Sequence, residues 1–180
     1  IVDLSTDHHH SCESPANLPF NSIDDSGALV NGLPMICDGS SYCFQYYAQD
    51  DTWHFAYPTL NNHNKGASAV LENGTWWVSG GTLLLGSSLY DSTGSRKGPY
   101  LPDPMQYHCM VTINSTNVLF AGGNFDGVIG NKVYLYNWVT DDWTKMDGMA
   151  QAREQHVCGK AGDKVLVTGG KITTLDYAGV

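Results

Sequence analysis

The chain has 180 residues, enough for one compact unit with a sizeable core, and carries a formal net charge of −9. Its nine Lys and Arg residues form no run beyond Arg96-Lys97, which makes nucleic acid and anionic membranes poor partners. No apolar run approaches the roughly 20 residues that a membrane-spanning helix needs. The first residue is Ile1 rather than Met, so we expect a processed N-terminus or a fragment boundary.

Residues 1–25 precede the first repeated unit. Ile1–Leu4 alternates apolar and polar residues, as a strand does. His8, His9 and His10 follow, and this tract is interpreted either as a solvated segment or as a weak metal site.

From residue 26 onward, short apolar runs end at Gly, Asn, Asp or Pro, and no segment keeps a helical spacing of apolar positions. This pattern predicts an all-β chain. The expected strands are 27–31, 33–38, 42–47 and 52–56 in unit one (26–57); 66–71, 75–79, 83–91 and a weak outer segment near Tyr100 in unit two (66–101); 108–113, 117–121, 132–139 and 143–145 in unit three (107–146); and 156–160, 164–168 and 173–177 in unit four (155–180).

The units share a glycine pair at the end of their second strand. The pairs are Gly80-Gly81, Gly122-Gly123 and Gly169-Gly170, and unit one has Asp38-Gly39 instead. The second glycines are 42, 42 and 47 residues apart, which is the repeat length of a propeller blade.

A tyrosine and a tryptophan follow the pair at fixed offsets in two of the units. Trp53 stands seven residues after Tyr46, and Trp143 stands seven after Tyr136, whereas unit two has Tyr90 without a matching Trp. These large rings are expected to fill the space between neighbouring sheets.

Together with a Met- or Pro-led link into a His-containing strand, seen in residues 149–156 and 104–108, this order resembles the kelch repeat. The resemblance implies a β-propeller of about four blades, each a four-stranded antiparallel sheet. It also leaves open a larger ring of six or seven blades. In the first case Ile1–Leu4 would supply the missing outer strand of unit four; in the second the remaining blades would lie elsewhere.

The expected strand order assigns the connecting loops to two faces. Two glycosylation sequons, at Asn73 and Asn114, fall in turns between first and second strands, so sugars would cover one face and leave the other open. The open face would gather the links between units, including Arg153, and the histidines His63, His108 and His156. Those histidines are either binding or metal residues or repeat residues that bond a neighbouring loop.

Five cysteines and two sequons predict an oxidising, extracellular location. Cys37 and Cys43 could meet across an antiparallel pair, and Cys109 and Cys158 begin the inner strands of adjacent units. Cys12 could pair with either set or with another chain, because five is an odd number.

No nucleophile elbow, phosphate loop or zinc-helix motif occurs, and the Tyr and His residues reproduce no copper site of the kind found in propeller oxidases. We therefore expect a secreted, non-catalytic module without a cofactor that binds a protein or a carbohydrate. The alternatives are a structural subunit of an extracellular assembly, completed by a strand or blades from a second copy or another chain, and a copper oxidase-like enzyme.

Overall fold

The computed structural model describes residues 17–18, 26–38, 42–82 and 84–172. Four features expected from the sequence therefore lie outside the described residues: the strand at Ile1–Leu4, the tract His8–His10, Cys12, and the third strand of unit four at 173–177. The described part consists of strands, turns and loops without helices. The expected all-β class is confirmed.

Three four-stranded antiparallel sheets and one two-stranded sheet follow each other along the chain. Sheet one is β1 (Ser26–Val30), β2 (Leu33–Cys37), β3 (Tyr42–Tyr47) and β4 (Thr52–Pro58). Sheet two is β5 (Ala67–Val70), β6 (Trp76–Ser79), β7 (Ser87–Asp91) and β8 (Gly94–Lys97). Sheet three is β9 (Cys109–Thr112), β10 (Asn117–Ala121), β13 (Val133–Asn137) and β14 (Asp142–Met146). Sheet four is β15 (Val157–Ala161) with β16 (Lys164–Thr168), and a small hairpin of β11 (Asn124–Phe125) and β12 (Val128–Ile129) interrupts sheet three.

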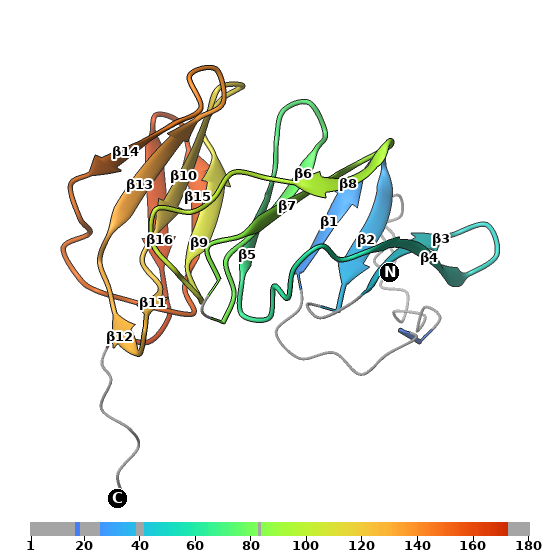
Figure 1. Ribbon diagram of the computed structural model, residues 1–180, viewed down its shortest axis with the longest axis horizontal. Helices are drawn as coiled ribbons and strands as arrows, with labels where there is room; N and C mark the ends of the chain where they lie inside the picture. Colours follow the sequence, from blue (N-terminus) through green and yellow to red (C-terminus); the bar gives the residue numbers. More distant parts are fainter. Residues whose placement is uncertain (1–16, 19–25, 39–41, 83, 173–180) are drawn as a thin grey trace, which may run out of the picture.

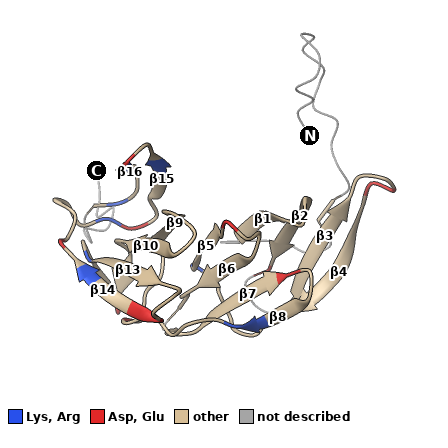
Figure 2. Cartoon of the chain, turned by 90° about the horizontal axis from the view of Figure 1, so that it is seen from above, with Lys and Arg blue, Asp and Glu red and all other residues tan. Residues whose placement is uncertain are grey.

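The sheets stand side by side in chain order (Figure 1). Seen from above, they follow an arc, with β1, β5 and β9 on its inner side and β4, β8 and β14 on its outer side (Figure 2). Neighbouring first strands touch each other: β1 contacts β5, β5 contacts β9, and β9 contacts β15. Each sheet thus packs a face against the next sheet, which is how a propeller stacks its blades.

Sheet two is buried on both faces because it lies between sheets one and three. The adjacent residues Trp76 and Trp77 point to opposite faces of β6, and both are fully buried. Trp76 packs with Val30 and Met35 of sheet one. Trp77 packs with Phe120 of sheet three. One pair of consecutive tryptophans therefore supplies the centre of two separate cores.

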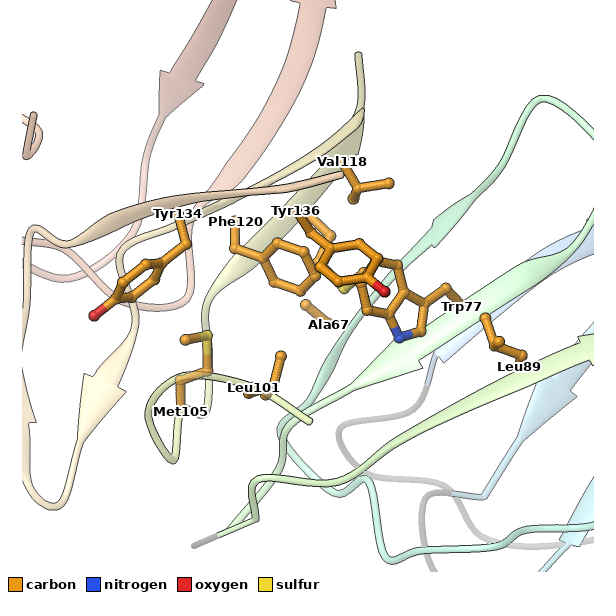
Figure 3. Packing of buried hydrophobic residues seen from close by; sticks show 10 residues of the cluster. Ala67, Trp77, Leu89, Leu101, Met105, Val118, Phe120, Tyr134 and Tyr136 are labelled. Atoms are coloured by element: carbon orange, nitrogen blue, oxygen red, sulfur yellow. The ribbon is translucent and has the colours of Figure 1, made fainter. Parts of the chain in front are cut away.

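The core between sheets two and three contains a group of aromatic rings among aliphatic and methionine side chains (Figure 3). The Trp77 ring centroid lies 4.9 Å from that of Phe120 and 5.4 Å from that of Tyr136. Trp138 and Trp143 pack against the same ring. Edge-to-face pairs of this kind add about 0.5–1.5 kcal/mol each beyond the burial of their area. Tyr136 and Trp143 therefore fill the space between sheets, as the repeat pattern predicts.

The seven-residue offset between Tyr and Trp has a direct structural cause. Tyr46 pairs with Trp53 across β3 and β4, and Tyr136 pairs with Trp143 across β13 and β14. Four residues form the turn in each case. The last turn residue, Asp51 or Asp141, has positive φ and accepts a hydrogen bond from the tyrosine hydroxyl.

The predicted outer segment of unit two near Tyr100 is wrong. The outer strand β8 comes earlier, at Gly94–Lys97, because Asp91 accepts a bond from the Thr93 amide and closes a two-residue turn. Gly94 has φ of 131°, a conformation that favours glycine. Tyr90 consequently pairs with Ser95 rather than with a tryptophan.

Both expected cysteine pairs are disulfides. Cys37 and Cys43 are directly opposed on β2 and β3 of sheet one. Cys109 and Cys158 join β9 to β15 and therefore fasten sheet four to sheet three. The first bond stabilises a single sheet, whereas the second fixes the position of one sheet against another.

Candidate functional site

The strand directions give the arc two loop faces. The turns after the first and third strands of each sheet lie at one end of the strands, and we call this end the sequon face because it carries Asn73 and Asn114. The loops after the second strands and the links between sheets lie at the other end, which we call the link face. Figure 1 shows the β5–β6 turn at the top of the molecule and the β11–β12 hairpin at the bottom.

Three histidines sit where the links enter the next sheet on the link face. His63, His108 and His156 are only 4%, 4% and 6% exposed. They begin or precede the inner strands β5, β9 and β15. His108 follows Tyr107 and His156 follows Gln155, and both of these preceding residues have positive φ.

Each histidine bonds the end of a second strand. The Nδ1–H of His63 donates to the Gly80 carbonyl oxygen at 2.8 Å, and its Nε2 accepts from the Ser88 hydroxyl at 2.8 Å. The Nε2–H of His108 donates to the Ser79 hydroxyl oxygen at 3.0 Å, since that hydroxyl donates to the Met110 sulfur. His156 donates from Nε2 to the Ala121 carbonyl oxygen at 3.1 Å. The rings therefore connect links to strands, which is the second of the two interpretations of these histidines.

Burial keeps these rings uncharged. It lowers the pKa of His63 and His156 below the ordinary value of 6.5. It lowers the pKa of His108 to about 3, and the nearby His156 and His63 add to the shift. In His63 one nitrogen donates and the other accepts, as an uncharged ring allows, whereas the Nδ1 atoms of His108 and His156 are buried without a hydrogen-bond partner among the described residues.

The glycine pairs make room for these histidines. A Cβ on Gly80 would lie 2.3 Å from the Met105 carbonyl oxygen and 2.7 Å from Cε1 of His108. A Cβ on Gly122 would lie 2.6 Å from Cε1 of His156. In these two pairs the first glycine thus lies against the histidine of the next sheet, whereas the Cβ position of Gly169 is open. The sequence analysis identified the glycines and the histidines separately but did not predict this contact.

Arg153, the fourth residue expected at a binding surface, also forms hydrogen bonds within the chain. Its Nη1 donates to the Gly169 carbonyl oxygen at 2.6 Å, and its Nη2 donates to the Gln151 side chain at 3.1 Å. The guanidinium therefore ties the link before sheet four to the glycine pair of that sheet.

Charged and polar side chains that the sequence analysis missed hold the rest of the link face together. Asp103 accepts bonds from Lys132 at 2.8 Å and from the Tyr134 hydroxyl. Burial opposes ionisation of Asp103, but these two bonds outweigh it and lower its pKa. Glu154 accepts from Asn124 at 2.7 Å. These partners are 29 to 31 residues apart in the chain, so no local motif indicates them.

The β11–β12 hairpin projects from the link face. The amide of Gly127 donates to the Asn124 side-chain oxygen at 2.7 Å, which closes its turn. Asp126 and Val128 are exposed at the tip, Val128 with 63% of its surface. Because Asn124 also bonds Glu154, the hairpin is fixed to the link before sheet four.

Beside the hairpin lies a shallow depression lined by Pro104, Gln106 and Asp126. Among the described residues, no three His, Cys, Asp or Glu side chains come close enough to hold a metal ion. In the same residues, no helix is long and apolar enough to cross a membrane.

The two sequon asparagines occupy similar turns on the opposite face. The Asn73 side-chain oxygen accepts from the Thr75 amide at 3.0 Å, and the Asn114 side-chain oxygen accepts from the Thr116 amide at 3.0 Å. Both asparagines are exposed. They lie in successive sheets, in the β5–β6 turn and the β9–β10 turn.

Comparison with known proteins bears on the fold alone. The sequence matches no protein-family model and no curated protein. A solved structure described as "Structure of YjhT" is similar, with a TM-score of 0.75 and 11% sequence identity. The similar region covers 87% of this chain and 61% of that one, so this chain spans less than two thirds of the length of that protein. At this identity the similarity shows a shared arrangement of sheets.

Proposed function

We propose that the chain is part or all of a secreted kelch-type β-propeller of four blades or more, and that it binds a protein ligand through its link face. The observation that carries this proposal is the placement of both sequons on the opposite face. N-linked sugars there would hinder docking on that side and leave the link face accessible.

The shape of the link face favours a large ligand over a small one. A small-molecule site encloses most of its ligand in a concave pocket, whereas a protein interface of standard size covers about 800 Å² of a nearly flat surface. The depression beside the hairpin is shallow, and the hairpin tip adds a protruding apolar residue, Val128. Loops held on a rigid scaffold commonly carry binding functions.

Two exposed valines provide the test. Val128 lies at the hairpin tip on the link face, and Val139, 76% exposed, lies in the β13–β14 turn on the sequon face. The purified chain would be used to capture proteins from the extracellular fluid of the source organism and to probe a glycan array. Val128→Arg should abolish capture, and the matched control Val139→Arg should retain it. Equal effects of both variants, or binding only to glycans, would contradict the proposal.

A second candidate is a subunit of an extracellular assembly, which the two end faces of the arc favour. On sheet one, Leu29 and Phe55 are exposed on the face that points away from sheet two. On sheet four, Val157 and Leu166 are exposed on the face opposite Cys158, which points to sheet three. Two different apolar faces at opposite ends suit head-to-tail contacts between copies.

Sedimentation separates this candidate from the first. If copies assemble through the end faces, Leu166→Lys should convert a concentration-dependent oligomer into a monomer, while Val128→Arg should leave the oligomer intact. A chain that sediments as a monomer at all concentrations would exclude this candidate without affecting the first.

A further inference from the structure

A groove on the sequon face separates the two glycosylation turns. It has a volume of about 220 Å³ and lies where sheet two meets sheet three. Its apolar lining comes from Leu71, Leu89 and Trp138, and its polar lining includes Asn73 and Arg96. This volume is below the roughly 300–1,000 Å³ of pockets that enclose drug-sized ligands, so the groove suits a unit of one or two small rings.

Asn73 is itself a residue of this groove, and its geometry leaves one atom available. The side-chain oxygen is used by the Thr75 amide, whereas no bond within the described residues involves its Nδ2. Nδ2 is the atom to which an N-glycan is attached. Transfer from a polyisoprenyl pyrophosphate-linked oligosaccharide breaks the sugar C1–O bond of the donor, forms the C1–Nδ2 bond and releases the amide proton. A sugar attached to this atom would start at the groove that Asn73 lines.

The groove offers the two kinds of surface that a sugar ring needs. The indole of Trp138 is half-buried and supplies a flat apolar face. Its Nε1–H is buried without a hydrogen-bond partner among the described residues, and a buried donor of this kind is costly unless an acceptor reaches it. Because this Nε1–H has almost no accessible surface, the donors that the groove offers to a sugar come from Arg96. The Arg96 guanidinium bonds Asp91 through Nη1 and has further N–H donors.

The second sequon provides an internal comparison. Asn114 also uses its side-chain oxygen within its own turn, where it accepts from the amides of Thr116 and Asn117. It does not line the groove, although the adjacent Ser115 does. A glycan on Asn114 would therefore start from an exposed turn, and a glycan on Asn73 would start inside the groove.

We propose that the core of the Asn73-linked glycan lies in this groove, with its first N-acetylglucosamine packed on Trp138 and close to Arg96. The inference rests on the proposed secretion, because N-glycans are added only along the secretory pathway. It assigns the glycan a structural role: the sugar covers the seam between sheets two and three.

The test is enzymatic release of the glycans from the folded chain, secreted by eukaryotic cells and followed site by site by glycopeptide mass spectrometry. A contact of the strength of an aromatic stacking pair should slow release at Asn73 about tenfold relative to Asn114. After denaturation the two sites should be released at equal rates. Trp138→Ala should remove the difference in the folded chain.

Because Trp138 also packs on Trp77, a second variant avoids the core. Arg96→Ala alters an exposed side chain of the groove and should speed release at Asn73, whereas Lys97→Ala on the same strand, outside the groove lining, should not. Equal release rates at two occupied sites in the folded chain would overturn the groove proposal and leave secretion standing. Absence of glycan at both sites would overturn the groove proposal and would also remove the sugar-covered face on which the proposed function depends.

Discussion

At the scale of single residues, the link face depends on buried histidines that remain uncharged. His63, His108 and His156 each bond the end of a second strand, and burial lowers the pKa of all three. The unfolded chain takes up protons near pH 6.5 while the folded chain does not. Stability must therefore fall as the pH falls through this range.

We predict a loss of stability as the pH falls below about 6.5, at up to about 1.4 kcal/mol per pH unit for a histidine that takes up its proton only in the unfolded chain; for His108 this range extends to about pH 3. Chemical unfolding at a series of pH values measures it. His108→Gln should give a shallower slope in this window. Asp91, whose pKa is lowered to about 2 chiefly by hydrogen bonds from Thr93 and Arg96, adds to the loss only below about pH 4. A slope that is flat from pH 6.5 to 4 would contradict the prediction.

The first glycine of the pair in sheet three has no room for a side chain. Gly122 has φ of 61°, and a Cβ there would lie 2.6 Å from the Arg153 carbonyl oxygen. Gly122→Ala is expected to lower the free energy of unfolding by more than about 2 kcal/mol. Gly159→Ala is the control, because that glycine has open space around its Cβ position and should change stability by less than about 0.5 kcal/mol. Equal effects in thermal unfolding would count against the contact.

At the scale of elements, the turn between third and fourth strands sets the register of the aromatic pair. In sheet three, the Tyr136 hydroxyl donates to Asp141, and this bond holds the turn that brings Trp143 opposite Tyr136. Burial and the bond to Asp141 raise the pKa of Tyr136. In sheet two, the shorter turn at Asp91 places Ser95 opposite Tyr90, and the pair is lost.

Tyr136→Phe should therefore destabilise the chain by about 1–2 kcal/mol, because it removes a bond to a charged acceptor and keeps the ring. The control is Tyr100→Phe, since that side chain is largely exposed. Denaturant midpoints at neutral pH give the comparison. If Tyr136→Phe lowers stability no more than Tyr100→Phe does, the hydrogen bond of the Tyr136 hydroxyl does not stabilise the fold.

At the scale of the whole molecule, the sheets are held by buried aromatic rings, by the glycine–histidine contacts and by one covalent bond. Sheets two and three share the core around Trp77, and sheets one and two share the core around Trp76. Sheet four has fewer buried residues in its described part, and Cys158 joins it to Cys109.

The two disulfides should differ in their effect on stability. Cys109 and Cys158 are 49 residues apart and Cys37 and Cys43 are six apart, so their loops predict losses of about 4 and about 2 kcal/mol when each pair is replaced by alanine. Loss of the Cys109–Cys158 pair should also speed hydrogen exchange in β15 and β16 more than in β2 and β3. The reverse order of stabilities, or unchanged exchange in sheet four, would contradict this account.

The sequence by itself determined the features that depend on local chemistry. Glycine pairs at a regular spacing and short apolar runs predict the sheets and most strand boundaries, because positive φ and side-chain alternation are properties of a few neighbouring residues. The Tyr-to-Trp offset predicts the outer hairpins of sheets one and three for the same reason. Sheet two lacks this offset, and its outer strand was wrongly predicted near Tyr100 because a two-residue turn at Asp91 replaces the four-residue turn.

Only the tertiary structure decided what the histidines, Arg153 and the sequon turns contact. The partners of His156 and Asp103 come from other parts of the chain, 35 and 29 to 31 residues away. The groove beside Asn73 forms only where Leu89 of one sheet and Trp138 of the next lie together. A hydrogen bond or a groove between sheets depends on how whole sheets are placed, and that placement depends on buried contacts over the full chain rather than on any single segment.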